Sequence, residues 1–117
     1  MSPRQWRFCV QDILEATRRI QRYVAGMDLE RFADDEKTQD AVVRQFILMG
    51  EAVRHIPSQI VRKYDYISWQ DIRAMRNFTV HVYWGVEPQT VWTTILEDLP
   101  VLAEELQALL EREREEQ

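Results

Sequence analysis

The sequence predicts an all-α protein, an up-and-down bundle of four longer helices with one or two short helical inserts. Apolar residues recur along most of the chain at alternating steps of four and three, the spacing of one helix face. The 117 residues include only 3 Gly and 4 Pro, which argues against a turn-rich β fold. No segment alternates as a strand would. This length predicts a single domain over residues 1–117.

The first helix is expected to begin at Ser2 as its cap, with Pro3 in the first turn, and to end near Gly26. Its predicted buried face consists of Trp6, Val10, Ile13, Thr17, Ile20 and Val24. Asp28 can cap a short helix over the following residues, LERFA. A second long helix is predicted over about 38–56, with a buried face made of Val42, Phe46, Met49, Val53 and Ile56.

Pro57 interrupts the helical pattern, and residues 58–64 predict another short helix. Ser68 and Asp71 have the S-x-x-D spacing of a capping box, so a third long helix is expected from Trp69 to the region of Tyr83.

The last helix is expected to open at Glu87 and Pro88. Its predicted buried face consists of Trp92, Ile95, Leu99, Leu102, Leu106 and Leu109. Pro100 lacks a backbone donor and should bend this helix. Residues 111–117, EREREEQ, carry four Glu against two Arg, so we expect a solvated, frayed end.

Composition narrows the class of protein. No apolar run approaches the ~20 residues that span a bilayer, and the polar start MSPRQWRFC does not resemble a secretory signal. Cys9 is the only cysteine, which fits a reducing cytoplasm. One Cys and two His cannot build the usual structural zinc site, so no metal and no cofactor are expected. The net charge of −5 is not that of a general nucleic-acid coat, although residues 40–83 carry six basic against four acidic side chains.

The stretch RAMRNFTVHVYWGV, residues 73–86, gathers chemistry that a core does not need. On a regular helix Arg73, Arg76 and Tyr83 lie nearly on one line, and Asn77 and His81 form a second line beside it. Arg76 and His81 are separated by about 140° around the axis. They can meet on one small ligand only if the helix loosens before residue 85 or a second subunit completes the site.

These residue types suit phosphate chemistry. Arg76 offers a planar fork of donors for phosphoryl oxygens, and His81 can move a proton near neutral pH. Together they could cleave RNA without a metal, through attack of the ribose 2′-hydroxyl on the neighbouring phosphorus. Structural alternatives stay open: a plain Arg–His pair, a buried Asn77 bonded to a helix end, or Arg73 paired with Asp71 or Glu51.

The segment RNFTVHVY, residues 76–83, resembles the R-x4-H-x-Y motif of HEPN-domain ribonuclease toxins, and most closely the HepT-like branch. TQDAVVRQFILMGEA, residues 38–52, resembles the second signature of that family. GVEPQTVWTTILEDLPVL, residues 85–102, resembles its third signature. The order and the spacing also agree, so the resemblance covers nearly the whole chain. Gln45 and Val82 depart from residues common in the family, which bears on local electrostatics and RNA preference.

The resemblance implies an HEPN-like bundle that forms a homodimer, with an active cleft at the dimer interface. It implies a metal-independent endoribonuclease with Arg76 and His81 as catalytic residues, and Asn77, Arg73 and Glu51 as supporting or RNA-binding residues. The implied system is a type VII-like (HepT/MntA) toxin–antitoxin pair, in which an MntA-like nucleotidyltransferase antitoxin transfers AMP to Tyr83. A bulky anion beside Arg76 would block phosphate binding.

A second hypothesis is a non-catalytic helical dimer that binds nucleotide or a nucleotidyltransferase partner. The net charge of −5 motivates it, because RNA affinity depends on cationic contacts.

Overall fold

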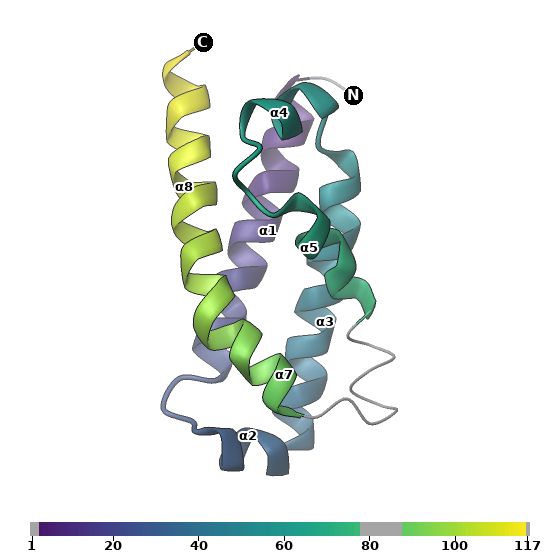
Figure 1. Ribbon diagram of the computed structural model, residues 1–117, viewed down its shortest axis with the longest axis vertical. Helices are drawn as coiled ribbons and strands as arrows, with labels where there is room; N and C mark the ends of the chain where they lie inside the picture. The colour runs from purple at the N-terminus through teal and green to yellow at the C-terminus, as the bar shows by residue number, and fades with distance from the viewer. Residues whose placement is uncertain (1–2, 78–87, 117) are drawn as a thin grey trace.

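The computed structural model describes residues 3–77 and 88–116, and this part of the chain is helical without any strand. Figure 1 labels the α-helices; the 3₁₀ segments η1 and η2 and the π-helical turn η3 lie between them. The elements are α1 (Pro3–Tyr23), α2 (Leu29–Asp34), α3 (Glu36–Ala52), η1 (Val53–His55), α4 (Ser58–Lys63), α5 (Trp69–Ala74), η2 (Met75–Asn77), α7 (Pro88–Thr93), η3 (Thr94–Asp98) and α8 (Leu99–Glu115).

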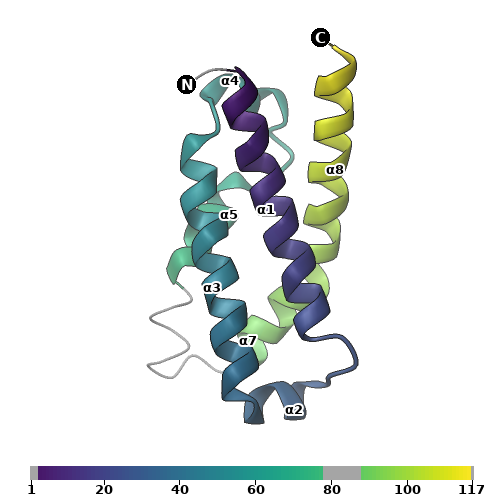
Figure 2. The ribbon, with the colours of Figure 1, turned by 180° about the vertical axis from the view of Figure 1, so that it is seen from behind.

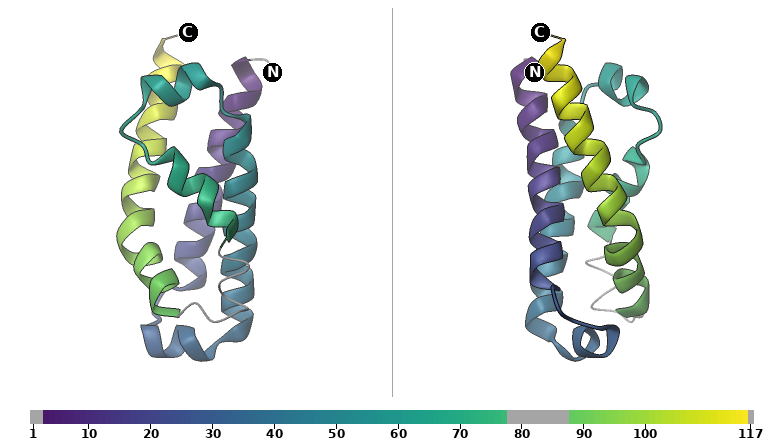
Figure 3. Two further views of the ribbon diagram at one scale, coloured as in Figure 1. Left: turned by 45° about the vertical axis from the view of Figure 1, so that its right-hand side comes forward. Right: turned by 90° about the vertical axis from the view of Figure 1, so that its left-hand side faces the viewer.

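The three longest helices, α1, α3 and α8, run side by side and form the body of the bundle (Figures 1 and 2). Helix α2 closes one end and α4 lies at the other, where α1 begins and α8 ends. Helix α5 lies across the bundle between α8 and α3 (Figure 3). The predicted all-α bundle is therefore confirmed. No helix in the described ranges is long and apolar enough to cross a membrane.

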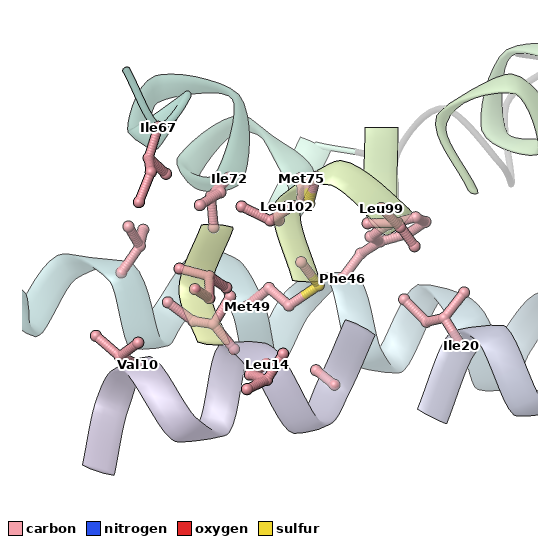
Figure 4. Packing of buried hydrophobic residues seen from close by; sticks show 14 of the residues in the cluster. Val10, Leu14, Ile20, Phe46, Met49, Ile67, Ile72, Met75, Leu99 and Leu102 are labelled. Carbon is pink, nitrogen blue, oxygen red and sulfur yellow. The ribbon is translucent and has the colours of Figure 1, made fainter. Parts of the chain in front are cut away.

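The predicted core faces are confirmed on all three long stretches. Every residue assigned to the buried faces of the first, second and last helices is at most 8% exposed. Thr17 is a polar member of this set, and its hydroxyl donates to the carbonyl oxygen of Ile13 at 3.0 Å. Figure 4 shows Val10 and Leu14 of α1 on one side of the core and Ile72 on the other, with Met49 of α3 between them.

The turns of the first half depend on specific side chains. Gly26 has a φ of 79°, a left-handed conformation that favours glycine, and it ends the turn after α1 as predicted. Asp28 caps α2 by accepting from the amide of Arg31 at 2.8 Å, also as predicted. Helix α3 begins earlier than expected, because Asp35 caps it by accepting from the amide of Thr38 at 3.0 Å. The Ser2 cap lies outside the described residues.

The capping box predicted at Ser68 is wrong, since the side chain of Ser68 makes no cap hydrogen bond. Helix α5 still begins at Trp69, and the indole Nε1 of Trp69 donates to the carbonyl oxygen of Tyr64 at 2.9 Å. The helix is α-helical only to Ala74 and tightens to 3₁₀ over Met75–Asn77. The remainder of the helix predicted from Trp69 lies outside the described residues.

Pro100 disturbs its helix as predicted. The preceding turn, η3, is a π-helix in which the amide of Leu99 donates to the carbonyl oxygen of Thr94. A proline in a helix leaves the carbonyl four residues earlier without its donor and clashes with it, and a widened turn relieves that clash. The chain bends between α7 and α8 at this turn (Figure 1).

The expectation of a solvated C-terminal end is wrong for Glu113. Helix α8 continues to Glu115, and Glu113 is only 8% exposed. Its carboxylate accepts from the Tyr64 hydroxyl, and the Lys63 ammonium lies 2.8 Å from the same oxygen. A buried carboxylate is tolerated when it is paired and hydrogen-bonded. Lys63, the last residue of α4, and Tyr64 directly after it supply these interactions.

Candidate active site

The structure places four of the six predicted site residues. Arg73 lies in α5, Arg76 and Asn77 lie in η2, and Glu51 lies near the end of α3. His81 and Tyr83 lie outside the described residues. The site is therefore described from its arginine side, where α3 and η2 meet.

Two core residues determine which side chains of α5 and η2 face solvent. Ile72 is 1% exposed and Met75 is 5% exposed, so both anchor the segment in the core. The residues between and after them, Arg73, Arg76 and Asn77, are exposed. Because the backbone is a 3₁₀ helix over Met75–Asn77, the regular 100° per residue used to predict the layout does not hold for these three residues. The alternative of a buried Asn77 is wrong.

Gly50 is a site residue that the sequence analysis missed. A Cβ atom built on Gly50 would lie 2.3 Å from Cγ of Arg76 and 3.2 Å from its Cδ. The same Cβ would lie 3.2 Å from the carbonyl oxygen of Arg73. The aliphatic part of Arg76 therefore lies directly against the backbone of α3. A signal existed in the sequence, since a lone glycine inside an apolar helical pattern costs ~1 kcal/mol relative to alanine.

Glu51, the next residue along α3, holds the polar end of the same side chain. Its Oε1 lies 3.1 Å from Nε of Arg76, and its Oε2 lies 3.3 Å from Nη1 of Arg54. The side chains of Glu51 and Arg76 are 43% and 49% exposed, so the pair contributes only about 0–1 kcal/mol to stability. The ion pair instead orients the Arg76 guanidinium. The sequence leaves open a pair between Arg73 and Glu51. In the structure, Glu51 pairs with Arg76 and Arg54.

Gln45 is buried on α3 at 4% exposure, and its Oε1 has no hydrogen-bond partner among the described residues. Such a buried acceptor is uncommon in folded proteins. This is one of the two positions at which the sequence departs from the resembled family.

A cavity of about 460 Å³ is lined from α5, η2, η3 and α8, and not from α3. Four carboxylates line it, those of Asp71, Glu97, Asp98 and Glu105, and no Lys or Arg joins them among the described residues. Burial raises the pKa of Glu105. A cavity of this charge disfavours a phosphate ligand. Within residues 3–77 and 88–116, no group of three His, Cys, Asp or Glu side chains is arranged to hold a metal.

Comparison with known proteins decides the family. Residues 13–109 match the family described as "Ribonuclease HepT-like". The chain belongs to the HepT-like ribonuclease family. This confirms the resemblance that the R-x4-H-x-Y motif and the two flanking segments indicate. No solved structure matches the chain significantly.

Three relatives illustrate how far the similarity to the HepT-like family extends. A Thermococcus cleftensis protein named "Probable ribonuclease HepT" is 37% identical over 93 residues, 80% of this chain and 84% of the relative. A Methanocaldococcus jannaschii protein named "Putative RNase" is 33% identical over 94% of this chain and 91% of the relative. A Caldanaerobacter subterraneus protein, also named "Putative RNase", is 30% identical over 90% of this chain and 94% of the relative.

Proposed function

We propose that this chain is a metal-independent endoribonuclease and the toxin of a HepT/MntA-like toxin–antitoxin pair. The observation that supports it best is Arg76, a half-exposed cation held at Nε by Glu51, in a chain of the HepT-like ribonuclease family. An always-charged guanidinium in a set position at the surface suits an anionic oxygen in a transition state.

In the proposed reaction, the ribose 2′-hydroxyl attacks the adjacent phosphorus and loses its proton. The bond from phosphorus to the 5′-oxygen breaks, and that leaving oxygen takes up a proton. The products are a 2′,3′-cyclic phosphate and a 5′-hydroxyl. His81 moves the proton, because an imidazole can do so near neutral pH. Arg76 stabilises the charge on the phosphoryl oxygens, and Asn77 and Arg73 bind the RNA backbone.

The proposed enzyme is a homodimer, and two copies of the motif line one cleft across the two-fold axis. Such a dimer would answer the spacing problem, since Arg76 and His81 are five residues apart. The proposed partner is an MntA-like nucleotidyltransferase antitoxin. The phenol oxygen of Tyr83 attacks the α-phosphorus of ATP, and pyrophosphate leaves. The AMP group then excludes RNA phosphate from Arg76 by its size and its negative charge.

The test is an RNA cleavage assay with purified protein in EDTA, after intact mass has shown Tyr83 to be unmodified. We compare the parent with Arg76→Ala and His81→Ala. The matched control is Arg19→Ala, because Nε of Arg19 pairs with Glu15 Oε1 at 3.3 Å on α1, a pair of similar geometry and exposure to that of Arg76. Cleavage by the parent and by the Arg19 variant, but not by the other two, is the expected result.

A folded, unmodified parent that cleaves no RNA in a broad panel would overturn the proposal. The non-catalytic binding module would then replace it. The modification is tested separately, by incubating the parent and Tyr83→Phe with ATP and the neighbouring nucleotidyltransferase. We expect a mass gain of one AMP on the parent alone, together with loss of cleavage by the parent alone.

A further inference from the structure

We infer that Gly50 is a positioning residue for Arg76: the absence of a side chain on α3 at this point holds the arginine in its catalytic place. This inference rests on the proposed function, because it assigns Gly50 a role through Arg76. Gly50 was not among the residues that the sequence pattern singled out. Its role follows from the contact between α3 and η2.

Two consecutive residues of α3 hold two parts of one side chain. Gly50 leaves the space in which Cγ and Cδ of Arg76 lie, and Glu51 pairs with Nε. The alkyl segment is thus limited by the helix backbone, and the guanidinium is directed by a carboxylate. Long side chains at a surface normally sample many rotamers, so this arrangement removes freedom before substrate binds.

Backbone conformation does not explain the glycine. Among the described residues the only glycine with positive φ is Gly26, and Gly50 lies within α3, which continues to Ala52. A glycine inside a helix weakens the helix relative to alanine. What an alanine would meet is the side chain of Arg76, at a separation of 2.3 Å, where real Cβ atoms are essentially never found. Space for Arg76 is the reason that the structure supplies.

The experiment measures cleavage kinetics and thermal stability of Gly50→Ala. The added methyl displaces the arginine by an ångström or more, and a displacement of that size costs about 10²-fold in rate. We expect kcat to fall by about that factor while KM for RNA changes little, because the charge of Arg76 stays at the surface. The control is Gly26→Ala, which strains a φ of 79° but has nothing within 4 Å of its Cβ. It should lose stability and keep its kcat.

The second measurement repeats Gly50→Ala in an Arg76→Ala background. Once Cγ and Cδ are gone, the nearest remaining neighbour of the methyl is the carbonyl oxygen of Arg73 at 3.2 Å. A shift of a few tenths of an ångström relieves that contact, and alanine favours the helix. Gly50→Ala should therefore lower the Tm of the parent, and leave unchanged or raise the Tm of Arg76→Ala. If Gly50→Ala alone does not fold, recovery of folding in the Arg76→Ala background supports the contact, and failure to recover overturns it.

The two proposals fail in distinguishable ways. Full activity of Arg76→Ala would overturn the assignment of Arg76 and hence the proposed function. An inactive Arg76→Ala beside a Gly50→Ala variant with the kcat of the parent would overturn the role of Gly50 alone. An equal fall in Tm in both backgrounds would also overturn it, because the methyl would then meet something other than Arg76.

Discussion

The hydroxyl of Tyr64 donates to Oε2 of Glu113 at 2.5 Å, and this bond joins the end of α4 to the last turn of α8. Tyr64 is only 1% exposed. The Lys63 ammonium reaches the same carboxylate oxygen, and Nη2 of Arg7 donates to the backbone carbonyl of Glu113 at 3.1 Å. Burial and the neighbouring carboxylate raise the pKa of Tyr64 to about 12. A terminal stretch that looks solvated is thereby held to the body of the bundle.

Tyr64→Phe should lower the free energy of unfolding by about 1.5–3 kcal/mol, since it removes a hydrogen bond to a charged, buried carboxylate. Urea unfolding followed by circular dichroism measures the difference. Tyr66→Phe is the matched control, because Tyr66 is 56% exposed and its hydroxyl makes no hydrogen bond within the described part of the chain. Equal stability losses for the two variants would contradict the role given to the Tyr64 bond.

The free energy of unfolding should fall in acid, because protonation of Glu113 removes its stabilising charge. Burial raises the pKa of Glu113, but the hydrogen bonds from Lys63 and Tyr64 outweigh burial, and the pKa is lowered below its ordinary 4.5. A depressed folded pKa gives stability that is present above about pH 4.5 and lost as the pH falls through the folded pKa. Urea midpoints between pH 3 and pH 7 should therefore decline on the acid side.

The matched variant for that titration is Glu113→Gln, which keeps the shape and removes the charge. It should be less stable than the parent near pH 7, and its urea midpoint should decline less between pH 7 and pH 3. If the urea midpoints of the parent and of Glu113→Gln declined equally as the pH falls, other carboxylates would account for the loss of stability in acid.

Glu51→Gln should reduce RNA cleavage while leaving stability nearly unchanged. The pair with Arg76 is half exposed, so its loss costs at most about 1 kcal/mol, whereas the guanidinium loses its direction. Glu15→Gln is the control, because Glu15 also pairs with two arginines, Arg19 and Arg22, at 3.3 Å each. Cleavage rates and melting temperatures of both variants are measured together. A Glu51→Gln variant as active as Glu15→Gln would show that Arg76 needs no carboxylate partner.

Met49→Ala should destabilise the bundle by about 2–5 kcal/mol, because it leaves a cavity where α1, α3 and α5 meet (Figure 4). Met49 is 0% exposed and its sulfur lies 4.0 Å from the Thr17 hydroxyl. Its neighbour Leu48 is 41% exposed, so Leu48→Ala should cost under ~1 kcal/mol by the same reasoning. Chemical denaturation of the two variants checks the pair. A similar cost at both positions would place the core boundary elsewhere on α3.

The core faces could be read from the chain because they depend on local geometry. Apolar side chains spaced by three and four must share a helix face, and burial of that face is the main gain available to a bundle. Trp6, Phe46 and Leu106 are each buried as this spacing predicts. Arg76 could be named as a candidate from the chain, since its motif is contiguous; its role stays a prediction. The early start of α3 was missed because Asp35 and Thr38 were not recognised as a cap pair.

The relationships that orient Arg76 and bury Glu113 depend instead on contacts between distant segments. The sequence around Gly50 does not predict that Arg76 packs on it. The sequence EREREEQ likewise does not predict that Glu113 is buried while the glutamates around it are exposed. Tyr64 and Glu113 are 49 residues apart. Helix periodicity and the motif determined the fold class, the core faces and the family. Packing of α3 against η2, and of α8 against α4, decided which charged groups are oriented or buried, because proximity between distant segments arises only when helices dock.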